Sequence, residues 1–220
     1  MALSNPFSAS GTPLDNAVAE TFFATFKKEE TYRREYTSER HFRKSVDEYI
    51  RFCKAGADEF FAGYVPYEWN KKYGTVLPLN RREVLGINVQ IGAESELRIL
   101  AALVRKYGKP VHLTFNSLYY TPEQYPEIAD VLHRCTELGF SSFIIADPAL
   151  LIYLKNNGIR CEIHLSGELG EMNSSVVETF AKMNLKRIIF HRKNSTADMQ
   201  AVIEAVERNR CSKAGQMEYE

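Results

Sequence analysis

Three polar residues follow one short apolar stretch at intervals of two positions. In the segment CEIHLSGEL they are His164, Ser166 and Glu168. An imidazole titrates near neutral pH, so His164 could act as a general base or donate a hydrogen bond to a substrate carbonyl. Glu168 is grouped with it as a second catalytic candidate. A buried histidine bonded to a neighbouring side chain would give the same pattern, so both interpretations stay open.

Further polar residues follow other apolar stretches. Asn116 is a third catalytic candidate, because its amide could orient a substrate amide or base ring; it could equally cap its own loop. Arg192 could bind a carboxylate or phosphate through two hydrogen bonds, or pair with Glu168 or Glu171. Asp147 precedes a proline, which favours a helix cap over a base. The other polar residues of this kind are Asn88, Gln90, Thr114, Tyr119, Tyr120 and His191. Of these, Asn88, Tyr119 and Tyr120 join Arg192 as predicted substrate-binding residues.

The histidines and cysteines form no recognisable metal or nucleophile motif. His164 and His191 would need a third ligand, and neither an HExxH nor an HxH spacing is present. Ser166 does not lie in a GxSxG turn, which argues against a serine nucleophile. The four cysteines are scattered without a CxxC pair: Cys53, Cys135, Cys161 and Cys211. We therefore predict no bound metal, and free thiols in a reducing cytoplasm.

Alternating strands and helices would position these candidates. Strands are predicted at 55–65, 82–90, 111–115, 141–147, 161–166 and 186–191, and helices at 93–107, 121–138, 148–157, 174–183 and 196–208. Short apolar strands separated by helices are typical of a parallel sheet in an α/β fold. The carboxyl ends of such strands meet on one side, which is the usual working face. Six strands fit either an open sheet or an incomplete barrel, and the pattern alone does not choose between them.

Two amphipathic helices are predicted before the first strand. Thr12 and Pro13 fit the start of a helix that runs to about Arg34, and a second helix is predicted from Thr37 to Cys53. Two such helices bury little of each other's apolar face, so the pair needs a partner surface. We predict a helical tail over 1–52, an α/β unit over 53–208 and a disordered tail over 209–220.

The helical tail resembles a known catalytic segment. PLDNAVAETFFATFKKEETYRREYTSERHFRKSVDEYIRF is similar to the end of the integrase-type catalytic domain of insertion-sequence transposases. By that resemblance Glu20 would be the metal-binding glutamate of the DDE triad. Phosphoryl transfer on DNA requires several carboxylates around two metals, and the two aspartates of the triad are not found before Met1. Glu20 is therefore interpreted as an inactive relic of the triad. DNA binding is not expected, because DNA-binding proteins are usually basic and this chain has a net charge of zero.

The remainder resembles a second family. AGADEFFAGYVPYEW, NRREVLGIN, KPVHLTFNSLYYTPEQYP, FIIADPALL, IHLSGELGEMNSSVV and LKRIIFHRKNS, within about 53–205, are similar to the front half of the U32, or collagenase-like, peptidases. The resemblance implies a β/α (TIM-type) barrel, here incomplete with about six parallel strands after a helical hairpin, and a peptide substrate. Some relatives hydroxylate RNA or ubiquinone precursors with an iron–sulfur cluster, so a modified RNA is the alternative substrate.

The resemblance also implies parts that were not recognised in the sequence. The family has a strand and helix before Ala55 and a cysteine-containing strand after Ala205; Cys211 alone cannot hold a cluster, so no cofactor is expected. We predict a truncated, inactive peptidase-like protein whose open strand edges could self-associate. The alternatives are a transposase fragment or a non-functional chimera. No apolar run of eighteen residues and no signal peptide is present, which predicts a cytoplasmic protein without membrane contact.

Overall fold

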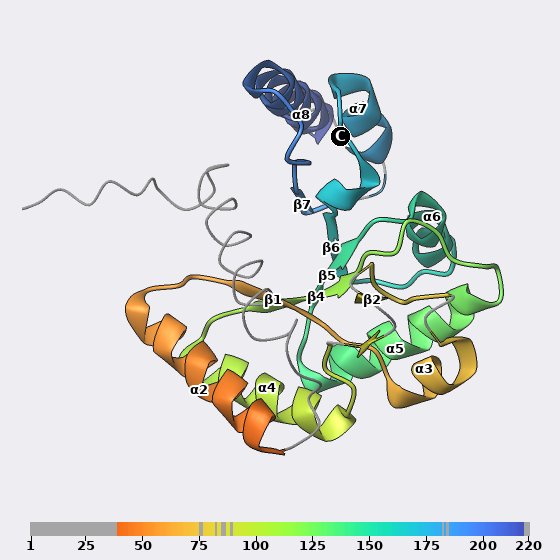
Figure 1. Ribbon diagram of the computed structural model, residues 1–220. Helices are drawn as coiled ribbons and strands as arrows, with labels where there is room; N and C mark the ends of the chain where they lie inside the picture. Colours follow the sequence, from red (N-terminus) through yellow and green to blue (C-terminus); the bar gives the residue numbers. More distant parts are fainter. Residues whose placement is uncertain are drawn as a thin grey trace, which may run out of the picture.

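The computed structural model describes residues 39–217, apart from 75–76, 82, 85–86, 89, 182 and 184. Strands and helices alternate along most of this length (Figure 1). The elements are α2 Glu39–Ala55, β1 Phe60–Gly63, α3 Tyr67–Tyr73, β2 Glu83–Val84, β3 Ile87–Asn88, α4 Glu94–Tyr107, β4 Val111–Phe115, α5 Gln124–Leu138, β5 Ser142–Ile145, α6 Pro148–Asn156, β6 Glu162–Leu165, the 3₁₀ turn η2 Gly167–Leu169, α7 Ser174–Ala181, β7 Arg187–Ile188 and α8 Thr196–Met217.

Five strands form one parallel sheet in the order β1-β4-β5-β6-β7. The register pairs Phe61 with His112, Ser142 with Glu162 and His164 with Arg187. The predicted α/β class is therefore confirmed. The sheet is not closed among the described residues, because β1 and β7 stand at opposite ends of the strand order.

The predicted strand at 82–90 does not join this sheet. Its described residues form β2 and β3, a separate antiparallel pair in which Val84 faces Ile87. The sequence between them, Leu85-Gly86, carries a glycine that is a better turn signal than a strand interior. A single bridge from Ile91 to Tyr64 continues the parallel arrangement beside β1, and the Ile91 N–H donates to the Gly63 carbonyl at 3.0 Å. The main sheet thus has five strands instead of the predicted six.

The apolar core lies between the sheet and the helices α2, α4, α5 and α6. Alternate strand residues are buried on this side, among them Leu113, Phe115, Phe143, Ile145 and Leu165. Helix α4 contacts α2 and α5, and α5 contacts α6, so the helices lie side by side along the sheet (Figure 1). Burying such apolar area contributes about 25 cal/mol per Å², which makes this layer the main source of stability.

Helix boundaries follow local signals that the sequence carries. Asp147 caps α6, and its carboxylate accepts a hydrogen bond from the Ala149 N–H at 2.8 Å. Gly139 ends α5 in a left-handed conformation with φ of 104°. Helix α5 begins at Gln124, three residues after the predicted start, because Thr121 and Gln124 bond to each other in a preceding turn.

Helix α2 packs against the start of the sheet. The Tyr49 ring lies 4.5 Å from the Phe60 ring, and its hydroxyl donates to the Lys109 carbonyl at 3.1 Å. The predicted second helix of the tail is therefore confirmed, and its apolar face packs against the start of the sheet. The predicted first helix and the candidate Glu20 lie outside the described residues.

Three elements differ from the predictions. The short helix α3 was not predicted; its Trp69 is buried and donates to the Leu77 carbonyl at 3.2 Å. Strand β7 covers only Arg187–Ile188 of the predicted 186–191. Helix α8 continues to Met217 instead of ending near Arg208, because Gly215, its one glycine, costs a helix only about 1 kcal/mol. Within the described residues, every helix is too short or too polar to span a bilayer.

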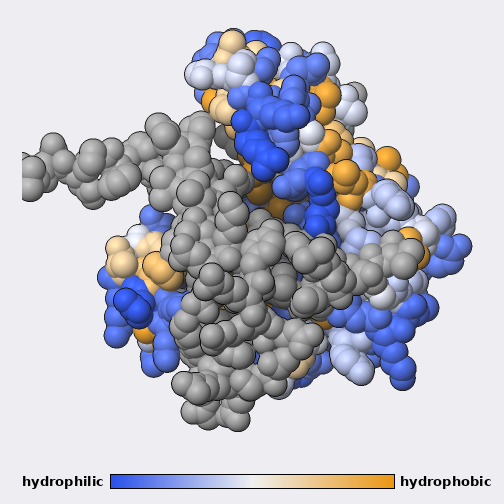
Figure 2. All heavy atoms as spheres, viewed as in Figure 1, coloured by the Kyte–Doolittle hydropathy of each residue, from blue (hydrophilic) through white to orange (hydrophobic). Residues whose placement is uncertain are grey.

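Figure 2 shows hydrophilic residues over most of the visible outer surface of the described chain. Hydrophobic residues gather between the part that carries α7 and α8, at the top, and the rest of the molecule. The face of the sheet that does not pack against α2, α4, α5 and α6 is called the inner face, and polar candidates such as Thr114 and His164 lie on it.

Candidate functional site

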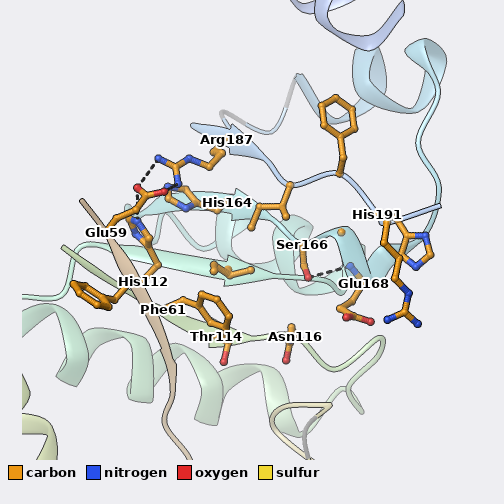
Figure 3. Close-up of a pocket in the computed structure, with 16 residues that line it drawn as sticks. Glu59, Phe61, His112, Thr114, Asn116, His164, Ser166, Glu168, Arg187 and His191 are labelled. Carbon is orange, nitrogen blue, oxygen red and sulfur yellow. Dashed lines mark hydrogen bonds and ion pairs between the residues drawn. The ribbon is translucent and has the colours of Figure 1, made fainter. Parts of the chain in front are cut away.

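A cavity of about 210 Å³ lies along the inner face of the sheet (Figure 3). Alternate residues of a strand point to the same face, so His112, Thr114 and Asn116 follow one another along β4 and the residue after it. His164 and Ser166 do the same along β6. The cavity therefore has two ends. One lies at the amino ends of the strands and the other at their carboxyl ends.

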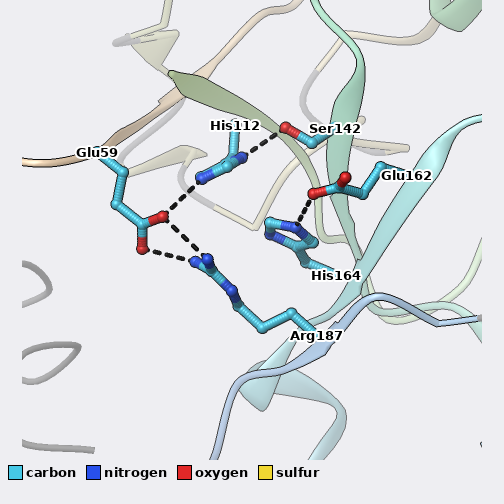
Figure 4. Close-up of polar contacts among 6 residues, drawn as sticks. All are labelled: Glu59, His112, Ser142, Glu162, His164 and Arg187. Carbon is cyan, nitrogen blue, oxygen red and sulfur yellow. Dashed lines mark hydrogen bonds and ion pairs between the residues drawn. The ribbon is translucent and has the colours of Figure 1, made fainter. Parts of the chain in front are cut away.

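Six polar side chains meet at the amino ends of the strands (Figure 4). We call them the N-terminal cluster: Glu59, His112, Ser142, Glu162, His164 and Arg187. Two guanidinium nitrogens of Arg187 donate to the two Glu59 oxygens at 2.6 and 2.9 Å. Because Glu59 precedes β1 and Arg187 begins β7, this ion pair joins the two ends of the sheet across the cavity.

Hydrogen bonds fix the protonation of Glu59 and the tautomer of His112. His112 Nε2 lies 3.2 Å from a Glu59 oxygen, so it carries the hydrogen, and Nδ1 lies 2.5 Å from the Ser142 hydroxyl, which donates to it in the neutral ring. The hydrogen bond from His112 and the charge of Arg187 outweigh burial and lower the pKa of Glu59 to about 2. The carboxylate is therefore ionised at neutral pH.

His164 belongs to the same cluster and has no exposed surface. Its Nε2 lies 2.9 Å from a Glu162 oxygen, and its ring centroid lies 4.4 Å from that of His112. Burial lowers the pKa of His164 despite the hydrogen bond to Glu162, and the charge of Arg187 adds to this effect. The ring is thus neutral with its hydrogen on Nε2, and Nδ1 has no hydrogen-bond partner among the described residues.

Five other polar residues stand at the carboxyl ends of the strands. We call them the C-terminal mouth: Asn116, Ser166, Glu168, His191 and Arg192. The Glu168 carboxylate forms an ion pair with Arg81, and both side chains are 45% exposed. Figure 3 shows Ser166, Glu168 and His191 together at this end, away from His164 and Arg187. All five were sequence candidates, and the structure brings them around one cavity.

Two loops of the mouth are held against each other. A Cβ atom on Gly167 would lie 2.7 Å from the Phe190 carbonyl oxygen, so the backbones can approach this closely only with glycine here. The buried Asn194 side chain bonds the Met172 backbone, donating to its carbonyl at 3.0 Å and accepting from its N–H at 3.5 Å. These contacts place Ser166 and Arg192 on the same wall.

Thr114 lines the cavity between its two ends, whereas the other predicted residues do not. Tyr120 is buried and its hydroxyl donates to the Leu79 carbonyl at 2.7 Å, which corrects its prediction as a substrate contact. Tyr119 is 69% exposed but lies outside the cavity wall. Asn88 is in β3, and its side chain lies outside the described part. Asp147 accepts from the Tyr120 N–H and the Tyr125 hydroxyl, each at 3.1 Å, in addition to capping α6.

Sequence reasoning missed five members of the cluster: Glu59, His112, Ser142, Glu162 and Arg187. One signal could have found His112. In VHLTFN the polar residues at 112, 114 and 116 alternate with apolar ones, as do those at 162, 164 and 166 in EIHLS. Such a pattern on buried parallel strands indicates a polar inner face. Glu59 and Arg187 carry no comparable local signal.

Metal-ligating side chains are not grouped in the part of the chain that the structure describes. No three His, Cys, Asp or Glu residues there are arranged to hold an ion. Cys53, Cys135 and Cys161 are free thiols. Burial raises the pKa of Cys135 to about 12 and that of Cys161 to about 11, so both stay protonated at neutral pH.

Comparisons with known proteins give one family. The model of Peptidase family U32 matches residues 44–220, beginning inside α2. The solved U32 peptidase Mk0906 is 14% identical with a TM-score of 0.47, covering 68% of this chain; the chain spans 65% of that protein's length. A solved 3-hexulose-6-phosphate synthase is 14% identical with a TM-score of 0.43, over 71% of this chain and 65% of its own. No curated protein sequence matches the chain.

Proposed function

Because the chain belongs to Peptidase family U32, we propose that it binds a peptide at the C-terminal mouth and that its described residues do not cleave that peptide. One observation carries the proposal: among the residues that the structure describes, the mouth offers polar contacts but no hydrogen-bonded pair of nucleophile and base. The Ser166 hydroxyl accepts from the Glu168 N–H at 3.2 Å, whereas the His164 ring is bonded to Glu162. A general base must lie within hydrogen-bond reach of the proton that it removes.

The size of the cavity suits part of a peptide. Sites for drug-sized ligands usually enclose about 300–1,000 Å³, and this cavity encloses about 210 Å³. It therefore admits one end or one side chain of a substrate. Asn116 and Ser166 are the proposed contacts for peptide amides, and Arg192 is the proposed contact for a charged group. In this proposal His164 and Glu162 have a structural role on the inner face of the sheet and do not contact the substrate.

The test measures binding and cleavage separately. The full chain is mixed with fluorescein-labelled peptides, and anisotropy reports binding while chromatography of the same samples reports cleavage. We expect saturable binding and no cleavage above that of the heat-inactivated chain. Absence of binding to every peptide would overturn the proposal.

The proposal that the described residues do not cleave the peptide would be overturned if cleavage is observed and depends on the residues predicted from the sequence as catalytic. The informative variants are His164→Asn and Glu168→Gln. If either abolishes cleavage while the circular dichroism spectrum and the unfolding midpoint are retained, that residue is catalytic. Glu168→Gln is the safer variant, since this side chain is exposed and its loss does not disturb the core.

A further inference from the structure

Backbone N–H groups determine which side-chain atoms accept hydrogen bonds, and therefore which remain as donors, in three residues of the C-terminal mouth. The Arg81 N–H lies 3.3 Å from the side-chain oxygen of Asn116. A backbone N–H can only donate, so the Asn116 atom that faces it is the oxygen. The amide nitrogen of Asn116, with its two hydrogens, is consequently left for the cavity that this residue lines.

The same reasoning applies to His191 and Ser166. The Lys193 N–H donates to His191 Nδ1 at 3.4 Å, so the neutral ring carries its hydrogen on Nε2. The Glu168 N–H donates to the Ser166 oxygen at 3.2 Å, and the hydroxyl keeps its own hydrogen to donate elsewhere. Three side chains from the ends of three strands thus each retain a donor (Figure 3).

The charged residues of the mouth also favour an acceptor ligand. The only acid that lines the mouth within the described residues is Glu168, and it is paired with Arg81. Arg192 lines the same cavity, is exposed, and forms no ion pair with another described side chain. Arginine presents several donors in one plane, which suits an acceptor with two oxygens. The mouth therefore combines donors with one uncompensated positive charge.

We propose that the C-terminal mouth is a subsite for a peptide carboxylate, in the first place the α-carboxylate at the carboxyl terminus. The inference rests on the peptide-binding function proposed above and names the group that is recognised. A carboxylate has only acceptors, so it matches Asn116, Ser166 and Arg192 at once. A carboxyl-terminal amide carries hydrogens that would face these donors, and a site built for one pattern disfavours the other.

The experiment compares two peptides that differ in this group alone. Fluorescein-labelled Ala-Ala-Ala with a free carboxyl terminus and its carboxyl-terminal amide are titrated with the full chain, and anisotropy gives both dissociation constants. We expect the free acid to bind about tenfold more tightly, as for the loss of one charge-assisted contact. An amidated peptide with an internal glutamate shows whether a side-chain carboxylate serves equally well.

Two variants test the donors, and a third is the control. Asn116→Asp keeps the oxygen that accepts from the Arg81 N–H but replaces the donor nitrogen by a second oxygen, so it should abolish the preference for the free acid. Arg192→Gln should lower the affinity for the acid to that for the amide. Lys193→Gln removes a neighbouring exposed charge that does not line the cavity, and both affinities should change by less than about twofold.

Each outcome decides one of the two proposals. Equal affinity for acid and amide would overturn the carboxylate subsite and leave peptide binding standing. Binding of neither peptide would overturn the proposed function. The third arm of the experiment uses inorganic phosphate. If phosphate binds, neither peptide does, and Arg192→Gln weakens phosphate binding, then the donors recognise an oxyanion that is not part of a peptide. The carboxylate assignment would then be wrong.

Discussion

The two ends of the cavity use the same residue types in opposite ways. The N-terminal cluster contains a glutamate, a histidine, a serine and an arginine that bond to one another, and the C-terminal mouth contains the same four types at Glu168, His191, Ser166 and Arg192. In the cluster each charged group meets its partner inside the chain. In the mouth the oriented donors remain available to a bound ligand. Residue type alone therefore does not separate a structural site from a binding site.

Position in the fold explains the difference. At the amino ends of parallel strands, polar residues of β/α folds usually serve stability, whereas binding residues follow the carboxyl ends. The Glu59–Arg187 pair also has a specific task, since it links β1 to β7, which share no backbone hydrogen bonds. Its side chains are 31% and 36% exposed, against 45% for both partners of the Arg81–Glu168 pair. The less exposed pair, Glu59–Arg187, should therefore contribute more to stability.

The largest expected effect comes from Glu59→Gln. This variant removes the charge that accepts hydrogen bonds from Arg187 and His112, and leaves the guanidinium half-buried without a counter-charge. We expect a loss of about 2 kcal/mol in the free energy of unfolding. Urea denaturation followed by circular dichroism measures it.

Glu168→Gln is the matched control at the other end. Its ion pair with Arg81 is more exposed, so the expected loss is under about 1 kcal/mol. In the double variant Glu59→Gln/Arg187→Gln, part of the loss should be recovered, because no charge is left unpaired. If the two single glutamate variants cost the same, the two ends do not differ as described.

The sheet and most helices were predictable because their signals are local. Apolar runs gave β1, β4, β5 and β6, Asp147-Pro148 gave the start of α6, and Gly139 gave the end of α5. The second predicted strand was wrong because the prediction gave too little weight to the glycine in Leu85-Gly86, which is a turn signal between two short strands. Helix α3 is short, and without a clear amphipathic pattern it had no signal to find.

The site was predictable as a set of positions but not as a set of contacts. Of the polar residues predicted near the carboxyl ends of strands, the structure brings Asn116, Ser166, Glu168 and Arg192 around one cavity and leaves Tyr119 and Tyr120 outside it. The contact between Glu59 and Arg187 spans 128 positions and depends on how the whole sheet curves. His164 lies on the predicted strand, but its hydrogen bond to Glu162 and its tilted ring contact with His112 place it in the cluster instead of the mouth.

The pH dependence of stability should separate two members of the cluster. The pKa of His164 is lowered below its ordinary value of 6.5, so the unfolded chain takes up this proton first, and stability begins to fall as the pH drops below about 6.5. The pKa of Glu59 is lowered from 4.5 to about 2, so its contribution is complete above about pH 4.5 and is lost as the pH falls towards 2. Thermal unfolding at closely spaced pH values measures both.

Variants assign these two windows. His164→Asn should abolish the loss that begins near pH 6.5 and keep the one below pH 4.5. Glu59→Gln should keep the first loss and reduce the second, to which Glu123, Glu127 and Asp198 also contribute because their pKa values are lowered too. A first window that persists in His164→Asn would mean that another group titrates there. The mouth offers a further check, since Glu168→Gln should leave both windows in place.

The smallest expected effect is the one on which the binding proposals depend most. Arg192→Gln should change the free energy of unfolding by less than about 0.5 kcal/mol, because Arg192 is exposed and has no ion pair among the described residues. Arg187→Gln, the matched change in the cluster, should cost about 2 kcal/mol, since it leaves the half-buried Glu59 carboxylate without its bidentate partner. Urea denaturation of the two variants gives the difference directly. If Arg192→Gln costs more than about 1 kcal/mol, the guanidinium already has a partner within the chain. The mouth would then resemble the cluster, and its donors would not be available for a carboxylate.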